Sequence, residues 1–274
     1  MSEPLQRPPI ASSPISVILF ARALATDADA SLQGWRHYLD TLNRDYEILL
    51  IRETRPETGP LQVPEATSRM RTLVYERTLG IRAAVNEAVS AARHPLVAFC
   101  ECDRQFDPAD LNVMLKTIDQ VDLVVGYRTG GQAPPWRVML DTLLRAASWV
   151  FIGVKLGPRV CWLGSEGWGR RWAARWLFGL RVLDPECPFR LMRRDIFQHL
   201  PIQSGGPFVH VEILAKANHL SCLMAEEPVT WKPPPEPTTD AISFGDDAWV
   251  VLRNPDFGPY VAPAETAEAP PPVS

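Results

Sequence analysis

Short apolar runs alternate with segments of helical period along most of the chain. Four runs have the length and composition of buried strands, at residues 15–20, 46–51, 96–100 and 121–126. Between them, apolar residues recur every three or four positions in three stripes: Leu32, Trp35, Leu39 and Leu42; Ile81, Ala84, Val85, Ala88 and Ala92; and Leu111, Met114, Leu115 and Ile118. The alternation predicts an α/β fold, a mostly parallel sheet flanked by helices.

The third helix has a clear start signal in Asp107 and Pro108. An Asp side chain can accept the unpaired amide hydrogens of a first helical turn, and Pro costs nothing at the first helical position. We therefore expect this helix to begin directly after Asp107.

The two ends of the chain differ in composition from the rest. Residues 1–14 and 258–274 are rich in Pro, Ala and Ser and hold few large apolar side chains. Such segments bury too little surface to offset the entropy of ordering them, so both are predicted to be disordered tails. The remaining residues, 15–257, are predicted to form a single domain.

Size and composition limit the class of protein. The chain has 274 residues, 46% of them apolar, and a net charge of −4. The slight excess of acidic residues argues against nucleic acid as the main partner, because binding to nucleic acid needs a basic protein surface. The apolar stretch 146–154 is about half of the roughly 20 residues that a membrane span needs, and the N-terminus lacks a basic-then-apolar leader. We expect neither a spanning helix nor a secretory leader.

The five cysteines are odd in number and form no CxxC pair: Cys100, Cys102, Cys161, Cys187 and Cys222. They are read as reduced thiols of a cytoplasmic protein rather than as disulfides or zinc ligands.

Acidic side chains follow the strand at 96–100. Glu101 and Asp103 stand where ligands bind in open α/β sheets, beyond the carboxyl end of a strand. Alternate residues of an extended segment face the same way, which directs both carboxylates and the Gln105 amide to one locus. Mg²⁺ and Mn²⁺ prefer one or two carboxylates completed by substrate phosphates. The segment therefore predicts a metal and diphosphate site; the alternative is a pair of solvated loop charges.

Residues 101–108, ECDRQFDP, resemble the D-x-D-x-Q-x-D-P element of family 2 glycosyltransferases of the GT-A fold. The likeness is strongest to the branch that uses polyprenyl phosphate, the dolichyl-phosphate mannosyl- and glucosyltransferases. Glu101 replaces the first Asp of the element, and four positions match: Asp103, Gln105, Asp107 and Pro108. Other segments resemble the family in the same order along the chain: 79–93, 122–128, 136–137, 184–194 and 208–217.

The resemblance implies an inverting transfer from a nucleotide-diphosphate sugar. Glu101, Asp103 and Gln105 would hold Mg²⁺ or Mn²⁺ with the donor diphosphate, and Arg128 and Arg137 would bind the phosphate of the acceptor. An anionic acceptor oxygen needs no strong general base, so catalysis would rest on positioning and charge stabilisation.

The resemblance also implies that three further residues shape the sugar site together with Asp103: Asp184, Arg190 and Glu212. Arg190 would approach the leaving diphosphate, and Asp184 would order the loop. The alternative for each arginine is a solvated or ion-paired side chain.

Two elements of the family pattern are missing. The first strand of the family ends in P-x-Y-N-E and the second in D-D-G-S-x-D, and both carry the nucleoside; here residues 20–24 read FARAL and 52–57 read RETRPE. Glu53 and Glu57 keep only the acidic character, and Glu53 is the predicted nucleoside-side contact. Asp141 stands where the lipid-phosphate branch often has Ser, and Pro188 replaces a Gly. Loss of catalysis is therefore a competing prediction.

Residues 136–181 hold six of the nine tryptophans, eight basic residues and two acidic ones. Trp168, Trp172 and Trp176 are spaced to share one helix face. Trp and Arg together suit the headgroup layer of a membrane, so docking on an anionic surface is one interpretation. Internal packing, on the sheet or on a second subunit, is the other.

These observations predict a metal-dependent inverting glycosyltransferase acting on polyprenyl phosphate, peripheral at the inner face of the cell membrane. A catalytically impaired binding protein and a transferase with a glycan or small-molecule acceptor are the alternatives. A homo-oligomer or a membrane-protein partner is left open.

Overall fold

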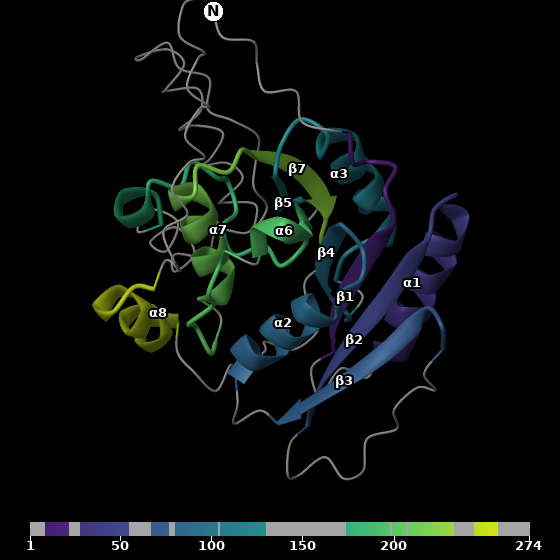
Figure 1. The fold of residues 1–274 in the computed structure, drawn as a ribbon, viewed down its shortest axis with the longest axis horizontal. Helices are drawn as coiled ribbons and strands as arrows, with labels where there is room; N and C mark the ends of the chain where they lie inside the picture. Colours follow the sequence, from purple (N-terminus) through teal and green to yellow (C-terminus); the bar gives the residue numbers. More distant parts are fainter. Residues whose placement is uncertain are drawn as a thin grey trace, which may run out of the picture.

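The computed structural model describes residues 9–21, 28–54, 67–76, 80–103, 105–129, 174–197, 199–206, 208–232 and 244–256. Within this part of the chain, seven strands form one sheet in the order β3-β2-β1-β4-β6-β5-β7 (Figure 1). The strands are β1 (Ile15–Ala21), β2 (Tyr46–Thr54), β3 (Met70–Glu76), β4 (Leu96–Glu101), β5 (Leu123–Thr129), β6 (Arg190–Arg193) and β7 (Met224–Thr230). The helices are α1 (Ala28–Thr41), α2 (Gly80–Ala91), α3 (Leu111–Thr117), α6 (Arg194–Phe197), α7 (Val209–His219) and α8 (Phe244–Arg253).

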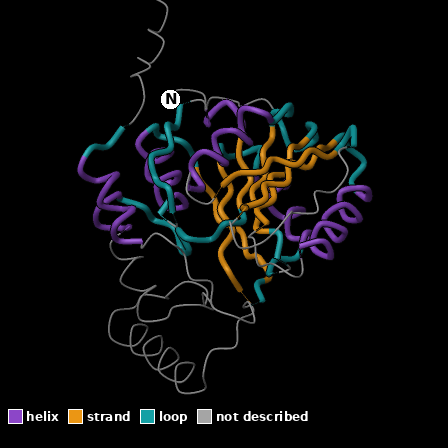
Figure 2. The backbone as a smooth tube through the Cα atoms, turned by 90° about the horizontal axis from the view of Figure 1, so that it is seen from below, coloured by secondary structure: helices purple, strands orange, loops and turns teal. Residues whose placement is uncertain are grey.

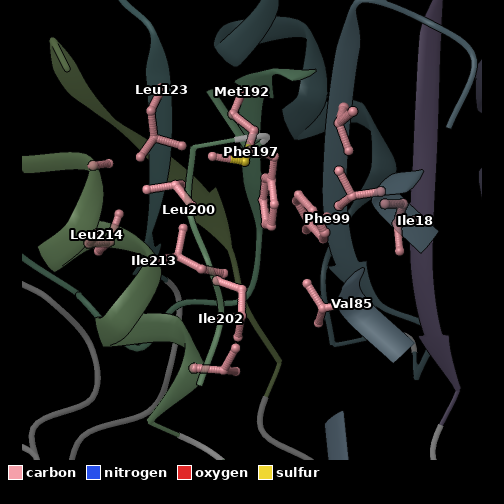
Figure 3. Close-up of a cluster of buried hydrophobic side chains, with 14 of the residues drawn as sticks. Ile18, Val85, Phe99, Leu123, Met192, Phe197, Leu200, Ile202, Ile213 and Leu214 are labelled. Atoms are coloured by element: carbon pink, nitrogen blue, oxygen red, sulfur yellow. The ribbon is translucent and has the colours of Figure 1, made fainter. Parts of the chain in front are cut away.

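Side chains of the central strands point alternately to the two faces of the sheet, so the core consists of two layers. In β1, Val17 and Leu19 face the layer covered by α1 and α3, whereas Ile18 and Phe20 face the layer covered by α2 and α7. Helices therefore lie on either side of the strands, as Figure 2 shows. Figure 3 shows the second layer, in which Phe99 of β4 lies 5.3 Å from Phe197 of α6 between ring centroids.

The predicted α/β class is correct, and the predicted strands and helices all form. The apolar stripes bury as expected, for example Trp35 and Leu39 on α1. The third helix begins as predicted: the Asp107 carboxylate accepts the Ala109 N–H, and the short 3-10 helix η2 (Pro108–Asp110) leads into α3.

Three strands, β3, β6 and β7, were not among those predicted. β3 and β7 are the edges of the sheet, where polar residues and Pro228 are tolerated because one side lacks a strand partner. β6 has only four residues, RLMR, too few to show a period.

The ordered chain extends further toward the N-terminus than predicted. The N–H groups of Ile10 and Ala11 donate to Asp119 Oδ1 at 2.6 and 2.7 Å, which ties residues of the expected tail to the end of α3. The predicted C-terminal tail and most of the tryptophan-rich segment lie outside the described residues. In the part of the chain that is described, no helix has the length and apolar character needed to cross a membrane.

β6 is antiparallel to both of its neighbours, β4 and β5, while the other strand pairs are parallel. Its approach to β5 is close at Gly126, whose N–H donates to Phe189 O at 2.9 Å. A Cβ at Gly126 would lie 2.9 Å from that same oxygen and 3.0 Å from a methyl group of Val229.

We therefore expect Gly126→Ala to lower the free energy of unfolding by about 1–3 kcal/mol, the usual cost of overpacking a core. Gly34→Ala is the matched control, because nothing lies within 4 Å of its Cβ position on α1. The control should leave stability unchanged or raise it by up to about 1 kcal/mol. Urea unfolding measures both; equal effects would show that the contact between β5 and β6 is not close in solution.

Candidate active site

The predicted acidic cluster lies at the carboxyl end of β4, beside β1. Glu101 pairs with Phe20 in the sheet, and the Cys102 N–H continues the ladder by donating to Phe20 O at 2.8 Å. Cys102 is fully buried in the layer below α1 and α3, so it faces away from its two neighbours as the alternation predicts. Burial raises the pKa of its thiol to about 12, which makes Cys102 a packing residue.

Gln105 joins the two carboxylates. Its Nε2 donates to Asp103 Oδ2 and, at 3.3 Å, to Glu101 Oε2. Its backbone N–H donates to Asp103 Oδ1 at 3.2 Å. Glu101 and Asp103 therefore converge on one point, as the alternation predicts.

The orientation of the Gln105 amide is set by Trp231, which follows β7. Trp231 Nε1 donates to Gln105 Oε1 at 2.8 Å. An indole nitrogen can only donate, so the amide oxygen faces Trp231 and the amide nitrogen faces the carboxylates. In this arrangement Gln105 is a hydrogen-bond donor to the carboxylates. Ligation of a metal through its oxygen, the predicted role, would require the amide to turn away from Trp231, and that role stays a prediction.

Burial and a neighbouring negative charge disfavour the ionised form of Asp103. Burial first, and then the charge of Glu101, raise the pKa of Asp103 to about 7 despite the hydrogen bonds from Gln105. The described residues contain no group of three or more His, Cys, Asp or Glu side chains arranged to hold a metal. Two oxygen donors at one locus fit Mg²⁺ or Mn²⁺, which take few protein carboxylates and complete their shell with phosphate and water.

An ion pair between Arg128 and Asp184 lies on the other side of Trp231. Arg128 Nε and Nη2 donate to the two Asp184 carboxylate oxygens at 2.6 and 2.8 Å. The side chains are 13% and 7% exposed, and the Arg128 Cζ lies 5.6 Å from the centroid of the Trp231 ring. Burial opposes the charge of Arg128, but Asp184 outweighs it and raises the pKa of the guanidinium. Arg128 is thus charged and held in one orientation. Its ion pair with Asp184 agrees with the alternative that the sequence analysis gave for each arginine, an ion-paired side chain.

Arg190 lies inside the protein and not at an open surface. It is 1% exposed, and it donates to the carbonyl oxygens of Pro185, Cys187 and His210 at 2.8, 3.0 and 2.7 Å. Burial lowers its pKa to about 10. These bonds fasten the loop that carries Asp184 to α7. The approach of Arg190 to a diphosphate stays a prediction.

Glu212 is also buried, at 1% exposure on α7. Its carboxylate accepts the N–H groups of Gln203 and Ser204 at 2.8 Å each and pairs with Lys216 at 2.6 Å. These contacts anchor the loop before α7 and are not shared with the acidic cluster. Within the described residues, Glu212 forms no hydrogen bond or ion pair with Asp103 or Asp184. Arg137 and the side chain of Glu53 lie outside the described residues.

Trp231 is the site residue that the sequence analysis missed. It is 5% exposed, and it contacts both Gln105 and Arg128. The available signal was a lone tryptophan after a polar edge strand, which by itself does not indicate a site.

A pocket lies between the sheet and helices α2 and α7, and its lining is mostly apolar: Phe20, Val85, Phe99, Pro188, Arg190, Met192, Val209, His210 and Ile213. The carboxylates of Glu101 and Asp103 do not line it, so this pocket does not match a diphosphate site.

Comparison with known proteins agrees with this architecture. A family model described as glycosyl transferase family 2 matches residues 34–201. No curated protein sequence matches the chain.

Solved structures of glucosyl-3-phosphoglycerate synthase from Mycobacterium tuberculosis are similar in fold. The complex with Mn²⁺, uridine-diphosphate-glucose and phosphoglyceric acid has a TM-score of 0.56 and 16% identity, covering 89% of this chain and 80% of that chain. The complex with uridine diphosphate has a TM-score of 0.54 and 14% identity, covering 89% of this chain and 81% of that chain. The complex with Mg²⁺ and uridine diphosphate has a TM-score of 0.52 and 14% identity, covering 84% of this chain and 74% of that chain. At these identities the likeness concerns the fold, and it confirms the GT-A class that the sequence predicts.

The buried Arg128–Asp184 pair predicts a large cost for Asp184→Asn. Removing one partner leaves a charge with little access to water, so the free energy of unfolding should fall by about 3 kcal/mol. Asp40→Asn is the matched control, because Asp40 pairs with Arg69 at 3.6 Å with side chains 59% and 55% exposed. It should cost less than about 1 kcal/mol. Equal losses in chemical denaturation would contradict the buried pair.

Proposed function

The chain belongs to glycosyl transferase family 2, and on that premise we propose that it moves a sugar from a nucleotide-diphosphate sugar to a phosphate-bearing acceptor, with inversion at the anomeric carbon. The observation that carries this proposal is the convergence of Glu101 and Asp103 on a single hydrogen-bond donor at the carboxyl end of β4. In open α/β sheets this is the edge at which ligands bind.

Glu101 and Asp103 are the proposed holders of Mg²⁺ or Mn²⁺. A divalent cation bound there would offset the negative charge that develops on the leaving diphosphate. The two side chains contribute a pair of oxygens facing one point, to which Gln105 Nε2 donates in the absence of a cation. Glu101 occupies the position of the family's first Asp, and a longer carboxylate still reaches the same donor.

Arg128 is the proposed contact for the acceptor phosphate. Asp184 keeps its guanidinium charged and oriented, and the Trp231 ring supports it from one face. Arg128 contacts Trp231, Trp231 contacts Gln105, and Gln105 contacts the two carboxylates. The phosphates of the donor and of the acceptor would therefore bind near each other at one edge of the sheet. Arg137 is proposed as a second acceptor contact on the family resemblance alone.

Polyprenyl phosphate at the cytoplasmic face of the membrane is the proposed acceptor. The described end of the tryptophan-rich segment supports it: Trp176 is 77% exposed and Leu177 62% exposed, next to the exposed Arg175. An apolar ring and a cation together suit a headgroup layer. A phosphorylated small molecule or a glycan is the alternative acceptor.

A second candidate function is binding without turnover. The altered residues at the ends of β1 and β2 favour it, since 20–24 and 52–57 lack the family's nucleoside motifs. The amide of Gln105 between the two carboxylates also favours it, because that group stands where a cation would bind.

We expect the wild-type chain to hydrolyse or transfer at least one nucleotide sugar in the presence of Mn²⁺, and Asp103→Asn to lower the turnover about a hundredfold or more, as loss of one electrostatic contact to a developing charge does. Glu87→Gln is the control, an exposed carboxylate on α2, and should match the wild type. Equal turnover by Asp103→Asn would exclude the proposed metal role. Absence of Mn²⁺-dependent binding of every common nucleotide sugar in calorimetry would favour binding without turnover.

The membrane-bound acceptor predicts that the chain floats with vesicles of anionic phosphatidylglycerol and not with neutral phosphatidylcholine. Raising the salt concentration should release it, because salt screens exposed charges. A chain that stays at the bottom of the gradient with both vesicles would remove the membrane role and favour a small-molecule or glycan acceptor.

A further inference from the structure

We propose that Trp231 is a positioning residue that holds Gln105 as an internal cap on Glu101 and Asp103, and that a divalent cation binds this pair in competition with the cap. The inference rests on the proposed metal role of the two carboxylates. It concerns a residue that neither the acidic motif nor the family resemblance indicates.

The backbone at Trp231 is hydrogen-bonded to two neighbouring segments, the end of β5 and the stretch that carries Gln105. The Trp231 backbone N–H donates to Thr129 O at 2.8 Å, at the end of β5. The next N–H, that of Lys232, donates to Gln105 O at 2.8 Å, and Phe106 forms a β-bridge with Trp231. With 5% exposure, the ring has little room to move, so the direction of its N–H is fixed by the fold.

This fixed donor makes one orientation of the Gln105 amide strongly preferred. In the observed orientation, Oε1 accepts from Trp231, and Nε2 donates to both carboxylates. Turning the amide would place its N–H₂ against the indole N–H and its oxygen against carboxylate oxygens. Both contacts would then be repulsive, and buried groups would lose their partners.

The capped carboxylates are the oxygens that a cation would use. Nε2 occupies one oxygen of each carboxylate, so a cation that binds these two oxygens must displace it. Any turn of the amide also gives up the bond from Trp231. The Trp231 N–H therefore favours the metal-free arrangement. Removing one such hydrogen bond should change the affinity for the cation by about three- to tenfold.

Trp231→Phe isolates the N–H from the ring. Phenylalanine keeps an aromatic face under Arg128, which lies 5.6 Å from the Trp231 ring centroid, and leaves the Arg128–Asp184 bonds in place. It lacks the donor that orients Gln105, together with the part of the indole that carries it. Trp249→Phe makes the same chemical change on α8, where the side chain is 65% exposed, and serves as the control.

The experiment is a titration of the full chain with Mn²⁺ alone, without nucleotide, with free Mn²⁺ measured by electron paramagnetic resonance. Trp231→Phe should bind Mn²⁺ about three to ten times more tightly than the wild type, and Trp249→Phe should equal the wild type. A merely structural role for Trp231 would weaken binding or leave it unchanged, and either result would overturn the inference.

Gln105→Leu tests the cap independently of whether the Trp231 variant folds. If Gln105 is a cap, Gln105→Leu binds Mn²⁺ more tightly than the wild type; if it is a ligand, binding weakens and the inference is wrong. In the Gln105→Leu background, Trp231→Phe should have no further effect, and a persisting effect would also overturn it. Absence of Mn²⁺ binding by the wild type and every variant would instead contradict the proposed metal-dependent function together with the cap.

Discussion

The antiparallel insertion of β6 between β4 and β5 is the constraint on which the rest of the site depends. A parallel strand would begin at the opposite edge of the sheet, but β6 begins at the edge where β4, β5 and β7 end. Its direction therefore carries the preceding loop, with Asp184, to the carboxyl edge beside Arg128. The close approach at Gly126 and the three carbonyl contacts of Arg190 hold that loop in place.

Charge at this edge is arranged in two unequal pairs. Arg128 and Asp184 compensate each other through two short hydrogen bonds. Burial first, and then the charge of Glu101, raise the pKa of Asp103, and both carboxylates accept a hydrogen bond from the Gln105 amide. The first pair is stable as it stands, whereas the second is the part of the site with most to gain from a cation. Trp231 contacts Arg128 of the first pair and Gln105, which in turn donates to both members of the second pair.

Most of the fold could be predicted from local patterns, and the exceptions have a common cause. Successive side chains of the buried strands β1 and β4 point alternately into two apolar layers, so nearly every residue of these strands is apolar and its burial can be predicted from the sequence. β3 and β7 lie at the edges, where half of the environment is polar, and β6 is too short to show a period. Arg190 and Glu212 illustrate a limit for side chains: their burial and their contacts with loop backbone could not be read from the residues around them.

The amino-acid sequence alone was sufficient to place Glu101 and Asp103 together with Cys102 turned inward, because side-chain direction in an extended segment repeats every two residues. It was also sufficient to indicate the family. The partners of these residues depended on the order of strands in the sheet, which no local pattern contains. Gln105 meets an indole 126 positions away, and Arg128 meets a carboxylate 56 positions away. Those contacts orient the amide and pair the guanidinium, so tertiary structure decided which of the predicted groups contact one another.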